Sequence, residues 1–200
     1  MTIFSNHKLI PTVTIKSQAE ADALKNILIH ASHPIVELTL RSGFSVEAVN
    51  TLLNDSELTI GIGTLTALSD LEGIDYKQAD FFVSPGSDLS LIKKLNNEVA
   101  PFVPGIETSS EIMLNKNAGI SVMKFFPAEL LGGTKKLQAY GDVYPEIKFL
   151  CTGGVNSANY KSYLACKNVV AVGGSFVLPE KYIHECDIEG GGDYLLNLKS

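Results

Sequence analysis

The chain has 200 residues, of which 45% are apolar and 19% are charged, a composition that predicts one globular domain around a single large core. Its net charge is −6 and its 16 basic residues are scattered, which argues against nucleic acid and anionic membranes as partners. A small anionic substrate remains compatible with this charge, because backbone N–H groups and one or two cations can hold an anion locally.

Cysteine usage and the N-terminal sequence bear on the compartment. Three cysteines, Cys151, Cys166 and Cys186, and a start without an export-signal pattern lead us to expect a cytoplasmic protein. No apolar stretch reaches the ~18 residues that a membrane span needs. The four histidines lack metal-ligand spacing, and we expect neither a metal nor another cofactor.

Short apolar runs recur along the chain at intervals of roughly 20 to 25 residues. In order they are LIPTVTI (9–15), PIVELTL (34–40), LTIGIGT (58–64), ADFFVSP (79–85), APFVPGI (100–106), SVMKFFPA (121–128), IKFLCTG (147–153) and NVVAVGG (168–174). Stretches with helical periodicity lie between them, at 18–30, 45–53, 89–96, 109–117, 134–140 and 157–167. This alternation predicts an α/β fold, a TIM (β/α)8 barrel, as a single domain over residues 1–200.

Local signals mark the helix ends. Ser17 with Glu20, and Thr108 with Glu111, have the spacing of capping boxes. Most apolar runs end in Gly, Pro, Ser or Thr, which predicts loops at the rim where such barrels carry their active sites. The last unit is weaker, because the glycines at 190–192 leave only a short apolar tail, and we expect a shortened C-terminal helix.

One lysine stands in the middle of the apolar run 121–128. Alternation places Val122, Lys124 and Phe126 on one face of the strand and the more apolar Met123 and Phe125 on the other, which suits the helix layer. We therefore expect Lys124 to point into the barrel, where burial disfavours its charged form and favours the neutral amine that a lysine nucleophile needs. The alternative is a strand-end lysine whose ammonium reaches water.

The second run carries further polar residues on its predicted inner face. Alternation directs Glu37, Thr39 and Arg41 inward and leaves valine and leucine for the helix layer. Glu37 could relay protons for an amine nucleophile at Lys124, or simply pair with it. Arg41 is the only arginine in the chain, and its planar guanidinium suits bidentate binding of a carboxylate, with a surface ion pair as the alternative.

The last two runs end in the glycine turns CTGGV and VGGS, at the positions where TIM barrels commonly bind phosphate. Gly153, Gly154, Gly173 and Gly174 would let backbone N–H groups approach an anion, and Ser175 adds a hydroxyl. Each glycine pair alone is also a common turn.

Two threonines lie at the same predicted rim. Thr64 ends the third run and Thr152 opens the CTGG turn. Their hydroxyls either face the mouth of the barrel or cap the helices that follow.

Segments spread over residues 8–179 match one family in order and spacing. They are KLIPTVTI, VELTLRS, GIGTL, FFVSPG, PFVPGIETSSE, KFFPAE, LQAYGDVYPEIKFLCTGGV, NYKSYLA and VAVGGSFVLP. The chain thereby resembles the 2-dehydro-3-deoxy-6-phosphogluconate (KDPG) and 4-hydroxy-2-oxoglutarate (KHG) aldolases. The resemblance implies a homotrimeric barrel that splits a 2-keto acid phosphate into pyruvate and glyceraldehyde 3-phosphate without metal. It also implies KHG, split into pyruvate and glyoxylate, as a candidate second substrate.

The resemblance also implies roles for individual residues. Lys124 would form the Schiff base, Glu37 would be the acid and base, and Arg41 would bind the carboxylate. Thr64 and Phe126 fall at the pyruvate end. The substrate-hydroxyl and phosphate end would comprise Thr152, Gly153, Gly154, Gly173, Gly174 and Ser175.

Some positions bear on specificity. Thr152 favours the gluconate epimer, because galactonate-type relatives tend to carry valine there. Three features depart from the family pattern: Ser42 in place of threonine after the arginine, the charge of Glu107 near the fifth run, and the short C-terminal tail, which bears on trimer contacts. The functional alternatives are a 2-dehydro-3-deoxy-6-phosphogalactonate aldolase, a non-covalent sugar-phosphate isomerase or epimerase, and a sugar-phosphate sensor without enzymatic activity.

Overall fold

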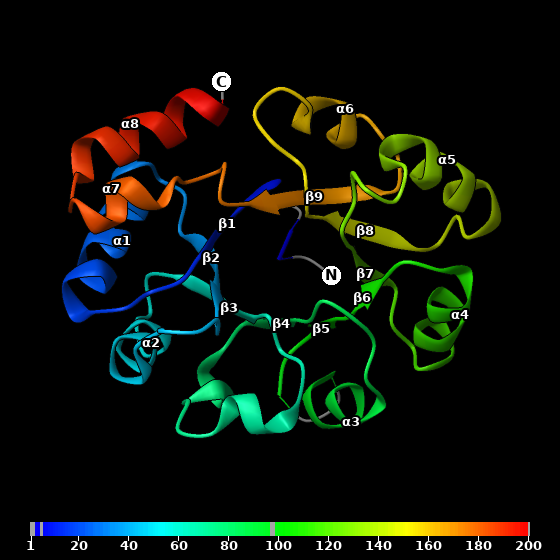
Figure 1. The fold of residues 1–200 in the computed structure, drawn as a ribbon, viewed down its shortest axis with the longest axis horizontal. Coiled ribbons are helices and arrows are strands. Elements are labelled where there is room, and N and C mark those ends of the chain that lie inside the picture. The colour runs from blue at the N-terminus through cyan, green and yellow to red at the C-terminus, as the bar shows by residue number, and fades with distance from the viewer. Residues whose placement is uncertain (1–2, 5, 97–98, 200) are drawn as a thin grey trace.

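The computed structural model describes residues 3–4, 6–96 and 99–199. Within these residues, nine parallel strands form a nearly closed barrel surrounded by helices (Figure 1). The strands are β1 (Leu9–Val13), β2 (Ile35–Thr39), β3 (Thr59–Gly63), β4 (Phe81–Val83), β5 (Phe102–Val103), β6 (Gly105–Ile106), β7 (Val122–Phe125), β8 (Lys148–Cys151) and β9 (Val169–Gly174). The predicted TIM-type barrel is confirmed.

The fifth predicted run is divided between β5 and β6. Pro104 separates them, and because proline has no N–H it cannot donate to the strand ladder. The sheet order is β5-β4-β3-β2-β1-β9-β8-β7-β6, so the two ends of the order meet at Pro104. The Lys124 backbone N–H donates to the Pro104 carbonyl over 2.8 Å. Each of the eight predicted runs therefore contributes to the barrel wall.

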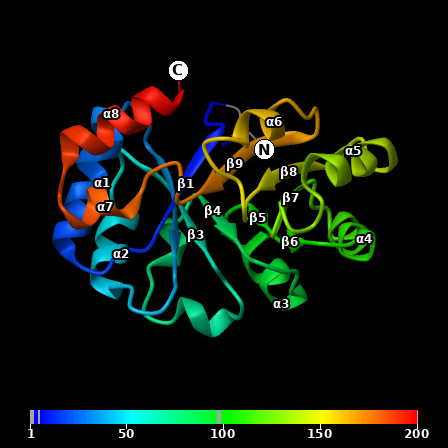
Figure 2. The same ribbon diagram turned by 45° about the horizontal axis from the view of Figure 1, so that its top comes forward.

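Helices follow most of the strands and form the outer layer. They are α1 (Gln18–His30), α2 (Val46–Leu53), α3 (Leu89–Leu91), α4 (Ser109–Asn117), α5 (Gly133–Val143), α6 (Tyr160–Leu164), α7 (Glu180–His184) and α8 (Ile188–Lys199). The unit after β3 has only two short 3-10 helices, Leu68–Leu71 and Tyr76–Gln78, and a π-helical segment, Ile92–Asn96, continues α3. Figure 2 shows α1, α7 and α8 together on one side of the barrel and α4 and α5 on the other.

The two capping motifs differ in detail. Thr108 and Glu111 form the complete reciprocal box at the start of α4. Ser17 accepts the Glu20 N–H at 3.3 Å, but the Glu20 carboxylate accepts the N–H of Lys16, one residue earlier than a box requires. Both arrangements satisfy N–H groups that the first helical turn leaves free.

The last helix is longer than the sequence predicted. α8 has 12 residues and includes all three glycines. A Cβ on Gly191 would lie 3.0 Å from Ile27 Cδ1, and one on Gly192 would lie 2.3 Å from His30 Cδ2. The glycines therefore allow α8 to pack closely against α1, and this packing offsets their low helix propensity.

The side chains that point into the barrel form an apolar layer, followed by a more polar layer nearer the C-terminal rim. An inner cluster, separate from the core under the helices, contains Phe4, Ile10, Ile35, Phe81, Val83, Val103, Val122, Leu150 and Ala171. We call this cluster the floor. Because strand side chains alternate, the next inward residue after a floor residue points into the barrel nearer the C-terminal rim. In four strand units that residue is polar: Thr12, Glu37, Lys124 and Thr152.

The helices also bear on membrane insertion. No helix in the part of the chain that the structure describes has both the length and the apolar character that crossing a bilayer requires.

Candidate active site

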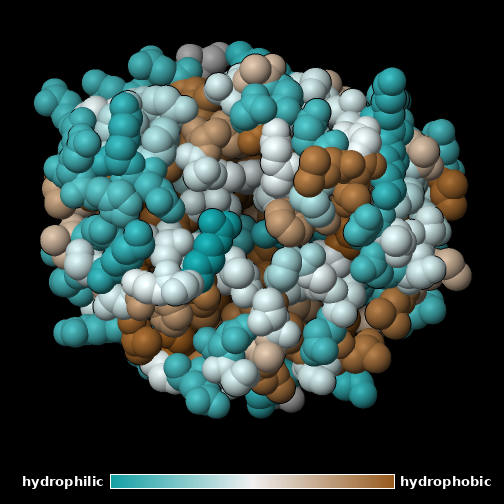
Figure 3. Space-filling view, in the orientation of Figure 1, coloured by the Kyte–Doolittle hydropathy of each residue, from teal (hydrophilic) through white to brown (hydrophobic). Residues whose placement is uncertain are grey.

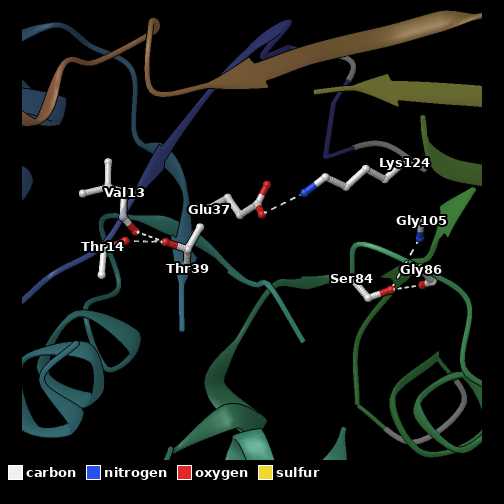
Figure 4. A network of polar contacts seen from close by, with 8 residues as sticks. All are labelled: Val13, Thr14, Glu37, Thr39, Ser84, Gly86, Gly105 and Lys124. Carbon is white, nitrogen blue, oxygen red and sulfur yellow. Dashed lines mark hydrogen bonds and ion pairs between the residues drawn. The ribbon is translucent and has the colours of Figure 1, made fainter. Parts of the chain in front are cut away.

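Glu37 and Lys124 approach each other across the barrel interior from β2 and β7 (Figure 4). Lys124 Nζ lies 3.4 Å from Glu37 Oε1, and the two side chains are 9% and 1% exposed. Their predicted inward orientation is confirmed. The alternative, a lysine that reaches water at the strand end, is not what the structure shows.

Only one of the two carboxylate oxygens of Glu37 has a hydrogen-bond partner among the described residues. Oε1 accepts from Lys124, but Oε2 is buried and has no hydrogen-bond partner among the described residues. The buried Oγ1 of Thr152 also lacks a partner there. Leaving a buried polar group unpaired costs about 1–3 kcal/mol, so such atoms point to a bound molecule that would complete their hydrogen bonds.

Lys124 is held from both sides of its strand. β7 pairs with β6 at Gly105 and with β8 at Leu150, so the backbone of Lys124 is fixed within the sheet. Its Nζ lies 5.3 Å from the centroid of the Phe126 ring. The fixed backbone, together with the Nζ contacts to Glu37 and to the Phe126 ring, positions the amine as a nucleophile requires.

Gly63 makes room for the Glu37 carboxylate. It pairs with Thr39 in the register of β2 and β3, and a Cβ on it would lie 2.1 Å from Glu37 Oε1. Any other residue at this position would occupy the space of the carboxylate. Sequence reasoning missed Gly63, although a glycine inside a strand is itself a signal of close approach.

A cavity of about 170 Å³ opens above the Glu37–Lys124 pair. Figure 3 shows the face seen in Figure 1 hollowed near its centre. The lining residues are Thr12, Glu37, Arg41, Lys124, Phe126, Thr152, Gly153, Gly154, Val155, Gly174 and Ser175. All the predicted site residues except Thr64 and Gly173 are among them. Thr12 and Val155 were not predicted.

The two exceptions are chain neighbours of residues at the site, Thr64 of Gly63 and Gly173 of Gly174. Thr64 follows β3 with φ of +66°, a left-handed conformation that is uncommon for a β-branched residue. Gly173 is buried in β9, and a Cβ on it would lie 3.2 Å from Thr152 Cγ2. Gly173 therefore allows β9 to approach Thr152 and does not itself line the cavity.

The turn after β8 packs against the segment after β7. The N–H groups of Ala128 and Glu129 donate to the carbonyls of Thr152 and Gly153 over 2.8 and 3.0 Å. A Cβ on Gly153 would lie 2.8 Å from Pro127 Cα, and Gly153 has φ of +87°. Only glycine fits this turn without strain, which explains why the sequence has glycine there.

Glu129 stabilises the same turn from outside the cavity. Its Oε2 accepts from the Tyr163 hydroxyl at 2.5 Å and from Asn159 Nδ2 at 3.3 Å. Asn159 Nδ2 also donates to the Gly154 carbonyl over 3.1 Å. Burial, together with the hydrogen bond to Glu129, raises the pKa of Tyr163. The hydroxyl thus remains a donor at neutral pH, and α6 is tied to the glycine turn.

The charges around the cavity favour an anion. Among the described residues that line it, Lys124 and Arg41 are cationic and Glu37 is the one carboxylate. No carboxylate of the described residues pairs with Arg41, so the predicted alternative of a surface ion pair is not observed. Arg41 is therefore available to an anionic group in the cavity.

Glu107 does not contribute to the cavity lining. It is exposed before α4, its N–H donates to Glu111 Oε2 over 2.8 Å, and its carbonyl accepts from the Tyr140 hydroxyl at 2.9 Å. Among the described residues, no cluster of three or more His, Cys, Asp or Glu side chains could hold a metal ion.

Comparison with known proteins agrees with this geometry. The family model of the KDPG and KHG aldolases matches residues 1–190 of the chain. The chain belongs to this family. The aldolase is 34% identical over 194 residues to the KHG/KDPG aldolase of Escherichia coli K12, an alignment that covers 96% of this chain and 88% of the relative. It is 36% identical over 187 residues to the 2-dehydro-3-deoxy-phosphogluconate aldolase of Dickeya dadantii, covering 93% and 85%.

Solved structures extend the similarity to three dimensions. The aldolase matches a KDPG aldolase from Legionella pneumophila with a TM-score of 0.92 and 32% identity, covering 98% of this chain and 96% of the other. That crystal structure contains pyruvate captured at low pH as a covalent carbinolamine intermediate. A native KDPGal structure, at 19% identity and a TM-score of 0.81, shares the fold. The aldolase is accordingly a carbon–carbon lyase, which removes the isomerase, epimerase and sensor alternatives.

Proposed function

We propose that the aldolase cleaves KDPG to pyruvate and glyceraldehyde 3-phosphate through a Schiff base on Lys124. The observation that carries this proposal is the buried pair of Lys124 Nζ and Glu37 Oε1, 3.4 Å apart beneath a cavity. Arg41 lines this cavity and has no carboxylate partner among the described residues. A buried pair that shares one proton can place that proton on Glu37 and leave the amine neutral and nucleophilic.

Schiff-base formation uses this shared proton. The neutral Lys124 amine attacks the C2 ketone, and the nitrogen passes a proton to the new oxygen, which gives a carbinolamine. Protonated Glu37 then donates to the hydroxyl, which leaves as water, and the iminium forms. Glu37 ends this stage as a carboxylate and is ready to act as a base.

Carbon–carbon cleavage and release return the pair to its starting state. The Glu37 carboxylate takes the proton of the C4 hydroxyl, the C3–C4 bond breaks, and its electrons flow into the iminium to form an enamine. Glyceraldehyde 3-phosphate leaves as the aldehyde. Glu37 then protonates C3 of the enamine, and water hydrolyses the pyruvate iminium and restores the amine and the proton on Glu37.

The rest of the cavity would orient the substrate. Arg41 binds the C1 carboxylate in a bidentate manner. Thr64 and Phe126 belong to the pyruvate end, Phe126 by packing over the Schiff base and Thr64 from beside the cavity. The N–H groups of Gly153 and Gly154 hold the phosphate from one turn.

The second glycine turn, Gly173, Gly174 and Ser175, completes the phosphate end. Remote binding of the phosphate fixes the reacting carbons relative to Lys124. The unpaired Oγ1 of Thr152 supports a contact to a substrate hydroxyl, and we assign the gluconate epimer on this basis. We also propose KHG, which would give pyruvate and glyoxylate, as a second substrate. The galactonate epimer is the alternative substrate.

Borohydride trapping tests the Schiff base directly. Reduction in the presence of pyruvate should add one reduced pyruvate to the protein, and peptide mapping should place it on Lys124. Lys124→Ala should lose the adduct and the activity but keep the circular dichroism spectrum. Lys136→Ala is the control, because Lys136 Nζ lies over the Tyr140 ring, outside the cavity lining. An adduct on another lysine, or normal turnover in Lys124→Ala, would overturn the proposal.

We propose a cytoplasmic homotrimer, as the resemblance to the family implies. The apolar side chain of Leu130, which is 86% exposed, supports a contact with a second copy of the chain. Sedimentation of the purified protein should give the mass of three chains. A Leu130→Asp variant that stays folded but sediments at lower mass would place Leu130 in the contact, and a monomeric wild type would contradict the assembly.

A further inference from the structure

A second cavity, of about 540 Å³, lies near the N-terminal ends of β1 and β2, away from the rim that carries the aldolase site. It is formed by the segment leading into β1, His33 before β2, α6 and the end of α8. Its lining residues are Asn6, His7, Lys8, Leu9, His33, Tyr160, Lys161, Leu164, Ala165, Leu198 and Lys199. None of them belongs to the aldolase site.

The charged side chains that line this cavity are basic. The described residues that line it include Lys8, Lys161 and Lys199 and two histidines, but neither aspartate nor glutamate. This is unexpected in a chain with a net charge of −6. Lys8 and Lys161 form no salt bridge with any residue that the structure describes. Three lysines from three segments therefore line one cavity, and no aspartate or glutamate of the described residues lines it with them.

Part of the cavity wall is fixed in place. His33 is 3% exposed, and its Nε2 is hydrogen-bonded to the Leu9 carbonyl at 2.7 Å. The His7 ring packs edge-on against it with centroids 5.3 Å apart. Lys199 Nζ donates to the carbonyls of Ala31 and Ser32 over 3.1 and 3.3 Å. These contacts hold one ammonium and two imidazoles at the site before any ligand arrives.

The surroundings of the two histidines lower their pKa values. Burial lowers the pKa of His33 to about 4, and burial followed by the charge of Lys199 lowers the pKa of His7. His7 faces His33 and Lys199 in this wall, with Lys8 next to it in the chain and Lys161 across the cavity on α6. An anion beside His7 would oppose the effect of Lys199 and raise the pKa of His7.

We propose that this cavity binds a small phosphate-bearing anion, at a site separate from the aldolase site. Lys8, Lys161 and Lys199 would supply the positive charge, since lysine ammonium groups bind phosphate as point charges. His7 and Asn6 would supply hydrogen bonds. The volume exceeds that of inorganic phosphate alone, so a phosphate ester of a small metabolite fits the site as well as the free ion does.

Histidine NMR signals test this site without interference from the aldolase site. Titrating inorganic phosphate at constant ionic strength should shift the imidazole C–H signals of His7 and His33 in a saturable way. His30 and His184 are internal controls, because they pair with Asp193 and Glu20 away from this cavity. Glycerol 3-phosphate in a parallel titration distinguishes an ester from the free ion: tighter binding of the ester identifies the ester as the ligand type.

Matched variants decide the outcome. The double variant Lys8→Gln, Lys161→Gln should bind phosphate at least about tenfold more weakly at this site. Lys77→Gln, Lys135→Gln removes the same charge elsewhere on the exposed surface and should bind as the wild type does. The proposal is overturned if phosphate and ester give no saturable shift, if chloride gives the same shift, or if both double variants bind equally well. Borohydride trapping on Lys124 is independent of all three results.

Discussion

Gly63 lies against the carboxylate of Glu37 so closely that a Cβ on it would come within 2.1 Å of Oε1. The position of the acid and base thus depends on a residue that has no side chain. We expect Gly63→Ala to displace the carboxylate and to lower kcat by on the order of 100-fold, the effect of misplacing a reacting group by about 1 Å. Steady-state kinetics measures this.

The control for this variant is Gly86→Ala, because a Cβ on Gly86 meets no atom within 4 Å. It should keep wild-type kcat. Wild-type kcat in a folded Gly63→Ala protein would mean that Glu37 tolerates displacement, contrary to its assigned role.

Glu37→Gln keeps the size of the side chain and an oxygen that can accept from Lys124, but it cannot exchange protons. We expect kcat to fall by about 10²- to 10⁴-fold, the usual contribution of general acid–base catalysis. Lys124 should still form a borohydride adduct with pyruvate, more slowly than in the wild type. Turnover at the wild-type rate would show that another group transfers the protons.

Thr12 is paired with Glu37 in the register of β1 and β2, and it lines the cavity. Its hydroxyl makes no hydrogen bond within the described residues. We expect Thr12→Val to lower kcat/KM roughly three- to tenfold, the effect of one hydrogen bond of about 0.5–1.5 kcal/mol to substrate or water.

Thr14→Val is the matched control for that variant. The Thr14 hydroxyl bonds to Thr39 Oγ1 at 2.7 Å and does not line the cavity. This variant should lower the free energy of unfolding by about 1 kcal/mol and leave kcat/KM unchanged. Equal kinetic effects of the two variants would remove the assignment of Thr12 to the site.

Tyr163→Phe should loosen the glycine turn by removing the hydroxyl that donates to Glu129. Because that turn would hold the phosphate, we expect KM for KDPG to rise several-fold while KM for the unphosphorylated KHG changes little. Tyr140→Phe removes a similar hydrogen bond, to the Glu107 carbonyl, and should change neither KM. An equal rise in both KM values would indicate a general structural effect instead.

His33 should make stability depend on pH. Its folded-state pKa of about 4 lies below the ordinary 6.5, so the unfolded chain binds more protons between these values. The free energy of unfolding should therefore fall as pH drops from about 6.5 towards 4, by a few kcal/mol at most. Urea unfolding at several pH values measures the slope of the free energy of unfolding against pH, and His33→Gln should reduce this slope. An unchanged slope would mean that other groups dominate.

Alternation along single strands was enough to predict the centre of the site. Lys124 and Glu37 are polar residues in apolar runs. A period of two puts each on the less apolar face of its strand, and that face is the one expected to line the barrel interior. The same rule also directs Thr12 inward, but threonine is common in strands and therefore gave no signal by itself.

Relationships between distant segments could not be predicted in this way. Tyr163 reaches Glu129 only because α6 packs beside the segment after β7, and Gly63 meets Glu37 only through the register of β2 and β3. The glycines of α8 led us to predict a shortened C-terminal helix, whereas close packing on α1 favours them within a 12-residue helix. In each case the deciding contact lies outside the local window of sequence.

The apolar floor of the barrel affects how the substrate preference of this enzyme can evolve. Ile10, Ile35, Val122 and Leu150 each lie two residues before a polar residue that faces the mouth, so stability and chemistry occupy alternate inward positions on the same strands. A substitution at the mouth leaves the apolar packing beneath it in place. New substrate preferences can therefore arise by single substitutions at Thr12 or Thr152 without a compensating change in the core.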